Sequence, residues 1–270
     1  MKAEYSDFCT SGGTWACRKF GHGNSLLVAF HGFADNGALF EQMAQPMEHD
    51  YTIYAPDLPW HGTTRWQEES FSPEDVAQLI SRIEQKENRS VNTLAGHSLG
   101  GRVAMAMFVR NPTAYKKLIL IAPDGIRTSW LSRFERFPEW ALNRGMALID
   151  RYPEKILSLL QILHAVHWIN SHSLKFFRRY LSNPEERSRA FRIWSSSGKF
   201  QVHPHALYLA AQTAKNPTLL VIGGRRDPIV PIKELRAFVY NMHPFASLLE
   251  MPGKHWLVSN ELGQKLASHQ

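Results

Sequence analysis

The segment 91–108 constrains the fold of this chain more than any other. An apolar run at residues 91–95 is followed by Gly-His-Ser-Leu-Gly at 96–100 and then by a helical pattern at 101–108. In this order of strand, turn and helix, small residues beside a serine permit a sharp, strained turn that lifts the hydroxyl clear of a sheet. The pattern therefore predicts Ser98 as a catalytic nucleophile.

The apolar run at residues 25–30 predicts a buried strand whose following loop suits the same chemistry. That loop begins His31-Gly32-Phe33. During attack by such a serine, the developing oxyanion is held by one backbone N–H from this loop and one from the residue after the serine. We therefore expect the N–H groups of Phe33 and Leu99 to form an oxyanion hole.

A serine hydroxyl also needs a general base and a group that orients this base. Two later strand patterns supply candidates, because residues 218–223 precede Asp227 and residues 246–251 precede His255. An acid after one strand and a histidine after the next give the chain order serine, acid, histidine.

With these motifs the sequence resembles the α/β-hydrolase superfamily over nearly its whole length. The resemblance implies that Ser98 is the nucleophile, His255 the general base and Asp227 its orienter. Some members of the superfamily place the acid after an earlier strand, so Asp124, which follows the apolar run 117–122, is the alternative acid. Asp57 also follows a strand pattern, and the resemblance implies that it is a structural loop residue.

The distribution of apolar residues predicts an α/β fold with an insertion. Strand and helix patterns alternate from about residue 15 to 122, which specifies a mainly parallel, twisted sheet with helices on both faces. Residues 125–205 show helical spacing without a strand, and in the superfamily such an all-helical insertion is a cap above the serine. The expected domains are therefore a core of 1–124 and 206–270 and a cap of 125–205.

The positive charge of the chain lies in the expected cap. Residues 125–205 carry 13 Lys and Arg against 6 Asp and Glu, whereas the rest of the chain carries 18 of each kind. Arginine suits recognition of carboxylates and phosphates, although a basic face that only keeps the protein soluble gives the same count. An anionic small substrate, an acidic carrier protein or an anionic membrane surface would fit the charge. Nucleic acid is not expected, because no binding motif accompanies it.

Arg102 is a candidate for binding a substrate carboxylate, because it lies one helical turn after Ser98. Residues 98–102 resemble the menaquinone-pathway synthase of the superfamily, which eliminates pyruvate with the same triad. His97 and the Ala-Asp-Asn at 34–36 depart from that family's pattern. The basic cap also resembles that of the esterases that remove a methyl ester from an acyl group on a carrier protein.

The leading functional hypothesis is a serine hydrolase that cleaves a carboxylic ester or thioester through an acyl-enzyme. A carbon–carbon bond hydrolase or pyruvate-eliminating lyase with the same triad is the alternative, and a ligand-binding receptor on the hydrolase fold is a further one. No cofactor or metal is expected, since the His pairs at 164/167 and 203/205 lack carboxylate or cysteine companions.

The sequence also favours a cytoplasmic protein. Residues 1–20 lack the apolar segment of a signal peptide, and no apolar stretch is long enough for an integral membrane segment. Cys9 and Cys17 are the only cysteines. We expect them to be separate thiols in a reducing compartment, although a hairpin could bring them into contact.

Overall fold

The structure is a computed structural model that describes residues 3–126, 139–169, 171–214 and 217–268. The chain divides into two compact units, Met1–Thr128 with Lys199–Gln270, and Ser129–Gly198. They are called the core unit and the helical unit below.

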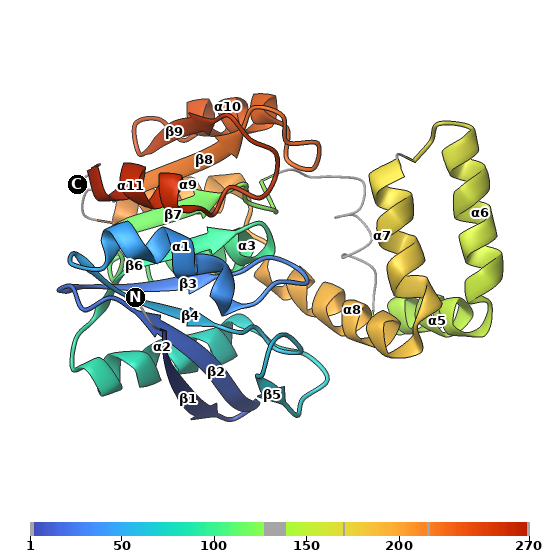
Figure 1. Cartoon of the computed structure of the whole chain (residues 1–270), viewed down its shortest axis with the longest axis horizontal. Helices are drawn as coiled ribbons and strands as arrows, with labels where there is room; N and C mark the ends of the chain where they lie inside the picture. Colours follow the sequence, from blue (N-terminus) through green and yellow to red (C-terminus); the bar gives the residue numbers. More distant parts are fainter. Residues whose placement is uncertain (1–2, 127–138, 170, 215–216, 269–270) are drawn as a thin grey trace. The chain divides into compact units, whose positions relative to one another are not determined.

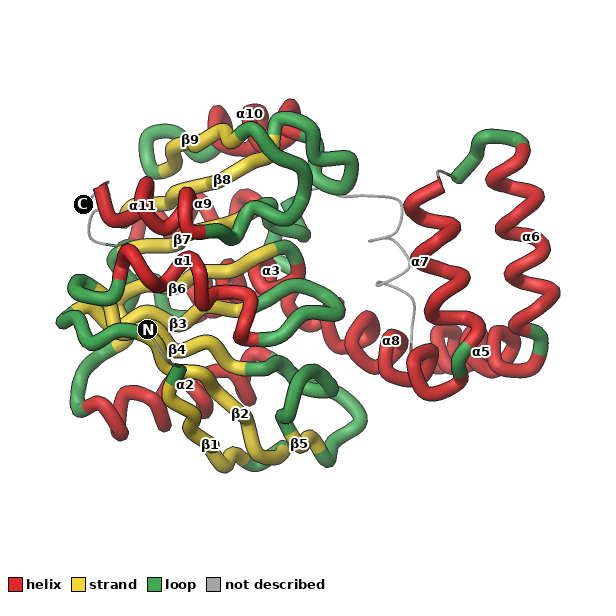
Figure 2. The backbone as a smooth tube through the Cα atoms, viewed as in Figure 1, coloured by secondary structure: helices red, strands yellow, loops and turns green. Residues whose placement is uncertain are grey.

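The core unit contains a mixed sheet in the order β1-β2-β4-β3-β6-β7-β8-β9, with β5 paired to β2 (Figures 1 and 2). Strand β2 pairs antiparallel with β1, β4 and β5, and all other pairings are parallel. The strands are β1 (Glu4–Thr10), β2 (Gly13–Phe20), β3 (Ser25–Phe30), β4 (Tyr51–Pro56), β5 (Arg65–Trp66), β6 (Val91–His97), β7 (Lys117–Ile121), β8 (Thr218–Gly224) and β9 (Ala246–Met251).

Helices flank this sheet and build the helical unit. Those of the core unit are η1 (Gly37–Phe40), α1 (Glu41–Ala44), η2 (Gln45–Met47), α2 (Pro73–Glu87), α3 (Leu99–Arg110), α9 (Pro204–Thr213), α10 (Ile232–Asn241) and α11 (Asn260–Ser268). The helical unit contains α5 (Glu139–Arg151), α6 (Pro153–Ala165), α7 (Ser171–Ser182) and α8 (Pro184–Ser197), and η3 (Gly198–Phe200) follows α8.

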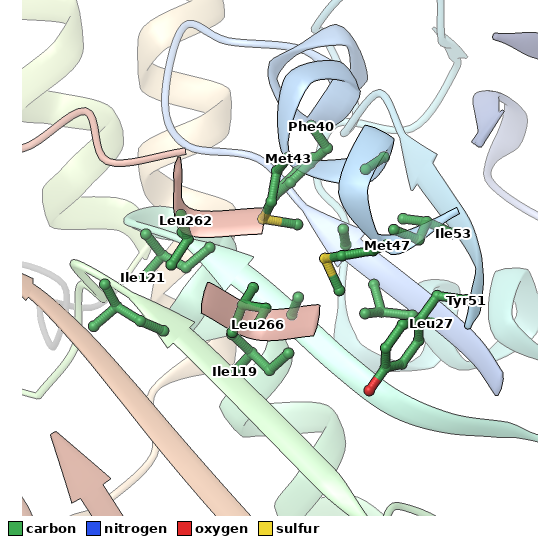
Figure 3. Close-up of a cluster of buried hydrophobic side chains, with 14 of the residues drawn as sticks. Leu27, Phe40, Met43, Met47, Tyr51, Ile53, Ile119, Ile121, Leu262 and Leu266 are labelled. Atoms are coloured by element: carbon green, nitrogen blue, oxygen red, sulfur yellow. The ribbon is translucent and has the colours of Figure 1, made fainter. Parts of the chain in front are cut away.

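One face of the sheet is closed by short helices from distant parts of the chain. Helices α1 and η2 contact α11, and their apolar side chains meet the alternate residues of the strands that point to this face (Figure 3). Burial of these side chains removes apolar surface from water, which is the main term that stabilises the sheet. The cluster includes Leu27, Phe40, Met43, Met47, Ile119, Ile121, Leu262 and Leu266.

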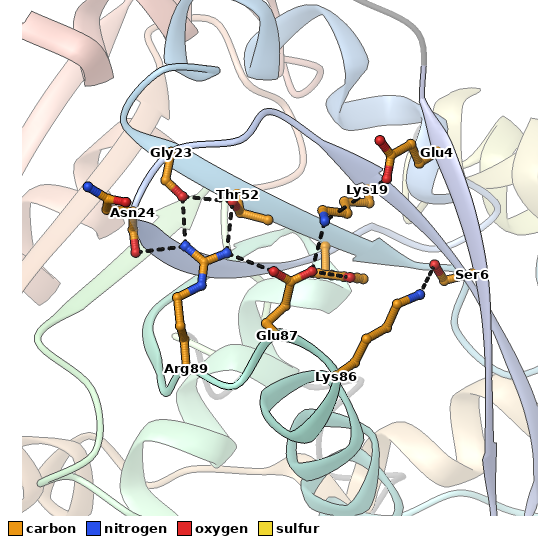
Figure 4. Close-up of polar contacts among 10 residues, drawn as sticks. Glu4, Ser6, Lys19, Gly23, Asn24, Thr52, Lys86, Glu87 and Arg89 are labelled. Atoms are coloured by element: carbon orange, nitrogen blue, oxygen red, sulfur yellow. Dashed lines mark hydrogen bonds and ion pairs between the residues drawn. The ribbon is translucent and has the colours of Figure 1, made fainter.

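A charged network ties the end of α2 to the antiparallel part of the sheet (Figure 4). Glu87 accepts hydrogen bonds from the Tyr54 hydroxyl at 2.6 Å and from Arg89 at 2.7 Å, and Lys19 lies 2.8 Å away. Burial raises the pKa of Glu87, but the hydrogen bonds from Lys19, Tyr54 and Arg89 outweigh it and lower the pKa to about 2. This carboxylate therefore stays charged at neutral pH and joins the end of α2 to β2 and β4.

The strands predicted from apolar runs are confirmed, and the sheet is mainly parallel between β3 and β9. Strands β1 and β5 are additional. The hairpin of β1 and β2 pairs Cys9 with Thr14 and Cys17 with Ser6, so its register keeps the two cysteines on different rungs. Both are free thiols, Cys9 exposed and Cys17 buried.

The core unit includes residues 125–128 and 199–205. The sequence analysis expected these residues in the cap because of their hydropathy pattern. Phe200 explains part of this difference, because it is fully buried and its ring lies 4.9 Å from that of Phe71. Among the described helices of the chain, none is both long and apolar enough to cross a membrane.

Candidate active site

Ser98 occupies a strained turn between β6 and α3. Its φ of 51° and ψ of −116° are unusual for a residue with a side chain, and such strain is typical of a nucleophile turn. Three backbone hydrogen bonds hold the turn: Ser98 N–H donates to Ile121 at 3.0 Å, and the carbonyl of Ser98 accepts from Gly101 and Asp124 at 2.9 Å each. The strain is therefore balanced by contacts with the ends of β7 and α3.

The glycines on either side of Ser98 are required by close backbone approach. A Cβ on Gly96 would lie 2.1 Å from the carbonyl oxygen of Gly100, and a Cβ on Gly100 would lie 1.9 Å from that of Phe30. Larger residues at these positions would push α3 away from β3 and β6. The Gly-x-Ser-x-Gly spacing thus has a steric cause in this fold.

Asp227 and His255 form a buried pair at the carboxyl ends of β8 and β9. The Nδ1–H of His255 donates to Oδ2 of Asp227 at 2.8 Å, and the other carboxylate oxygen accepts from the N–H groups of Ile229 at 2.7 Å and Val230 at 3.0 Å. Burial raises the pKa of Asp227, but these hydrogen bonds, that from His255 first, outweigh it and hold the pKa below its usual value. With Nδ1 protonated, Nε2 of His255 is the nitrogen that can accept a proton.

The alternative acid, Asp124, has a different partner. Its Oδ2 accepts from the Arg102 guanidinium at 2.8 Å, and its Oδ1 accepts from the N–H of Gly125 at 2.7 Å. The Arg102 side chain is buried, at 5% exposure, while that of Asp124 is 47% exposed. Arg102, predicted to bind a substrate carboxylate, thus already binds a carboxylate of this chain. Binding of a substrate carboxylate by Arg102 remains a prediction.

We expect Arg102→Ala to lower thermal stability by several degrees, because it removes a largely buried guanidinium and leaves Asp124 without this partner. Hydrolysis of a neutral and of a carboxylate-bearing ester should then fall by the same factor, measured as kcat/KM on both. Arg102→Lys serves as the control that retains a cation. A loss at least tenfold greater for the anionic ester would contradict this expectation and support a substrate-anchoring role.

Two buried histidines brace the loop after β3. The Nδ1–H of His31 donates to Gly32 at 2.7 Å, and its Nε2 accepts from the N–H of Leu58 at 2.9 Å. The Nδ1–H of His61 donates to Pro59 at 3.0 Å, and its Nε2 accepts from the N–H of Ala34 at 3.3 Å. Burial first, and then the neighbouring imidazole of His61, hold the pKa of His31 well below its usual range.

The two predicted oxyanion donors belong to different segments that meet near Ser98. Leu99 is the first residue of α3, so its N–H has no acceptor within the helix and benefits from the helix dipole. Phe33 follows Gly32, at which a Cβ would lie 3.2 Å from Cβ of Ser98. The loop and the nucleophile turn are therefore neighbours, and the assignment of Phe33 and Leu99 as donors remains a prediction.

Asp57, expected to be structural, is fully buried and accepts several hydrogen bonds. It accepts hydrogen bonds from Arg18 at 2.6 Å, from the N–H of Gly37 at 2.8 Å and from the N–H of Thr63 at 2.9 Å. Asp35 lies in the loop after β3 and was given no role in the sequence analysis. Burial raises its pKa, and the charge of His255 partly opposes this effect.

His97 links the nucleophile turn to the loop that carries His255. Its Nε2–H donates to the backbone carbonyl of His255 at 3.1 Å, and the two rings lie 5.1 Å apart. Its ring is 1% exposed. Burial first, and then the nearby His255 charge, lower the pKa of His97 to about 4 despite the bond to the carbonyl. In the sequence, only its place directly before Ser98 pointed to a role of His97 in positioning the site.

We expect His97→Leu to lower kcat about 10- to 100-fold, because the backbone of His255 loses a bond that fixes its distance from Ser98. His97→Gln keeps a donor of similar reach and should retain most of the activity. Both variants are to be compared in steady-state hydrolysis at neutral pH, with thermal unfolding as the control for folding. Equal activity of the Leu variant and the parent protein would contradict this positioning role.

The same histidine predicts acid sensitivity. The folded state keeps His97 neutral down to about pH 4, whereas the unfolded chain takes up a proton below about pH 6.5. The unfolding free energy should therefore fall as the pH is lowered from 6.5 to 4, by about 3 kcal/mol for this group alone. Urea unfolding at several pH values measures the slope, which should be smaller in His97→Gln. An unchanged slope in that variant would contradict the assignment.

Within the described ranges, no group of three or more His, Cys, Asp or Glu side chains is arranged to hold a metal ion. Of the four histidines noted in pairs, His164 binds the carbonyl of Ile169 at 2.9 Å through its ring nitrogen. His203 caps α9, since its Nδ1 accepts from the N–H of His205 at 3.2 Å. Both contacts are structural.

Comparison with known proteins places the chain in a family. Residues 25–243 match the family model described as alpha/beta hydrolase fold, and the chain therefore belongs to the α/β-hydrolase fold family. Its relatives include proteins named as esterases and hydrolases, and the protein is an enzyme of the α/β-hydrolase family.

Individual relatives are distant. A pimeloyl-[acyl-carrier protein] methyl ester esterase of Pseudoalteromonas atlantica is 25% identical over 224 residues, which cover 82% of this chain and 82% of that protein. A probable serine hydrolase of Drosophila melanogaster is 37% identical over 98 residues, which cover 35% of this chain and 30% of that protein.

Solved structures share the fold at low identity. A thermophilic esterase from Thermogutta terrifontis superimposes with a TM-score of 0.66 at 16% identity, covering 98% of this chain and 96% of that one. A thioesterase domain from the curacin biosynthetic pathway gives a TM-score of 0.64 at 16% identity, covering 99% of both chains. At this identity the likeness concerns the fold alone.

Proposed function

We propose that the protein hydrolyses a carboxylic ester or thioester with Ser98, His255 and Asp227 as its catalytic triad. The observation that supports this most is the buried hydrogen bond of 2.8 Å from His255 to Asp227. The strained turn that carries Ser98 is a second one. The bond orients the imidazole so that Nε2 is available as the base. The hydrogen bond from His97, the residue before Ser98, to the His255 backbone supports the proximity of base and nucleophile.

In the proposed mechanism, Oγ of Ser98 attacks the carbonyl carbon while Nε2 of His255 takes its proton. The N–H groups of Phe33 and Leu99 stabilise the oxyanion, and Asp227 stabilises the imidazolium. His255 then returns the proton to the leaving alcohol or thiol, which produces an acyl-Ser98 enzyme. Water, deprotonated by His255, releases the carboxylic acid and restores the serine.

A fluorophosphonate probe tests this proposal directly, because it forms a covalent bond with an activated serine. Intact-mass analysis should show one adduct, peptide mapping should place it on Ser98, and p-nitrophenyl esters should be turned over. Denatured protein is the control for non-specific labelling. Neither labelling nor turnover of an ester panel would contradict the enzyme assignment for this site and leave ligand binding as its function.

A carrier-bound substrate is a second candidate within the same chemistry. It is supported by the methyl ester esterase relative, whose name specifies an acyl-carrier protein substrate, and by the excess of seven positive charges in residues 125–205. An acidic carrier would be attracted to such a segment over a distance that salt shortens to about 8 Å at physiological ionic strength.

The salt dependence of kcat/KM distinguishes this candidate from a small neutral substrate. With an acyl methyl ester attached to an acidic carrier protein, kcat/KM should fall about tenfold or more from low to physiological salt. The free methyl ester provides the control and should change little. Equal values with and without the carrier, at every salt concentration, would eliminate the carrier as a recognised part of the substrate.

A further inference from the structure

The helical unit carries an exposed apolar stripe along α6. Tyr152, Leu159, Ile162 and Val166 recur at intervals of seven, three and four residues, so they share one face of the helix. Ile162 is 61% exposed, and Trp168, just after the helix, is 81% exposed. We call these five residues the outer stripe.

The outer stripe is distinct from the face that α6 uses within its own unit. Helix α6 contacts α7, and Figure 1 shows these two helices side by side. The apolar residues at half-turn offsets from the stripe, Leu157, Leu160 and Leu163, are only partly exposed. The helix is therefore apolar on two sides, and packing within the unit accounts for one of them. Exposed apolar residues gathered on one face of a helix mark an interaction site.

Cations accompany the outer stripe at its N-terminal end. Lys155 lies on the same face, and its Nζ is 4.9 Å from the centre of the Tyr152 ring, while the Arg151 guanidinium is 5.6 Å from it. No ion pair joins either cation to an acid in the part of the chain that the structure describes. The nearby Asp150 binds Arg187 at 2.5 Å.

The net charge of the helical unit is positive, like that of Lys155 and Arg151. Residues 129–198 contain 11 Lys and Arg against 6 Asp and Glu. A second copy of the unit would carry the same excess of positive charge, and like charges repel. A fluid surface with negative charge at its boundary and an apolar interior complements the outer stripe and its cations better than a second copy does.

We propose that the outer stripe docks the protein on an anionic lipid bilayer. The aliphatic side chains enter the boundary between headgroups and acyl chains, where Tyr152 and Trp168 also place their amphipathic rings. Lys155 and Arg151 lie at the level of the lipid phosphates. Docking does not involve the triad, so Ser98→Ala should bind vesicles as the parent protein does.

Sedimentation of the full chain with lipid vesicles tests the proposal. We expect binding to vesicles of equimolar phosphatidylcholine and phosphatidylglycerol, and at least tenfold weaker binding to phosphatidylcholine alone. Raising the salt concentration should weaken the former, since each cation near an anionic surface contributes a screened attraction. Absence of sedimentation with the anionic vesicles, at any salt concentration, would overturn the proposal.

Variants separate the apolar and the charged parts. Ile162→Asp/Val166→Asp should abolish sedimentation, and Arg151→Gln/Lys155→Gln should weaken it about 25-fold, from about 1 kcal/mol for each cation. Matched controls on the core unit are Tyr240→Ser, which removes another exposed aromatic ring, and Lys116→Gln/Lys233→Gln, which removes two other exposed cations. Both controls should bind as the parent protein does.

Three further results would overturn the proposal. Controls that lose binding as much as the stripe variants would mean general electrostatic adsorption. A concentration-dependent dimer that Ile162→Asp/Val166→Asp converts to a monomer would assign the stripe to self-association. A large loss of hydrolysis of a soluble ester in these variants, with vesicle binding retained and folding verified by circular dichroism, would assign it to catalysis.

Discussion

Ser98→Ala is expected to abolish fluorophosphonate labelling and to lower ester turnover at least about a thousandfold, because in the proposed mechanism the Ser98 oxygen is the atom that forms the acyl-enzyme. The fold should persist, since the change removes one oxygen. The backbone strain of the turn should stay the same, because alanine and serine both carry a Cβ. Labelling is measured by intact mass, turnover with p-nitrophenyl esters, and folding by circular dichroism.

The control for Ser98→Ala is Ser247→Ala, which removes an exposed hydroxyl from β9 and should change neither readout. His255→Ala should lose about as much activity as Ser98→Ala, and the double variant should be little worse than either, because triad residues act as a unit. Ester hydrolysis unchanged in Ser98→Ala would contradict the triad.

Asp227→Asn has the second large expected effect, a fall in kcat of about 10³ to 10⁴. An amide can present its N–H₂ group to Nδ1 of His255, and this favours the tautomer in which Nε2 carries the proton and is no base. The two N–H groups that bind Oδ1 of Asp227 can still bind the amide oxygen. Folding should therefore be retained while turnover is lost.

Asp124→Asn is the matched variant, and it should cost less than about tenfold in kcat. Its amide oxygen can still accept from Arg102, so the pair is weakened but not removed. Both variants are to be measured with the same p-nitrophenyl ester at neutral pH, with circular dichroism as the control for folding. A larger loss in Asp124→Asn would transfer the role of the acid to that residue.

Local patterns accounted for much of the fold. Apolar runs of five or six residues predicted β3, β6, β7, β8 and β9. A strand buried on both faces, such as β3, needs apolar side chains at successive positions. The Gly-x-Ser-x-Gly spacing predicted the turn at Ser98, because only glycine tolerates the approach of backbone atoms at positions 96 and 100. Strand β1 was not predicted, since it lies at the edge of the sheet and most of its side chains are partly or fully exposed.

What the sequence by itself determined was the chain order of the elements and the residues at the strand ends: Ser98, Asp124, Asp227 and His255. Which acid contacts His255 depended on the tertiary structure, because the pairing is set by the direction of each side chain after its strand. The fold directs Asp227 to His255 and Asp124 to Arg102. The exposure of the outer stripe was likewise decided in three dimensions, since helical periodicity defines a face but not what covers it.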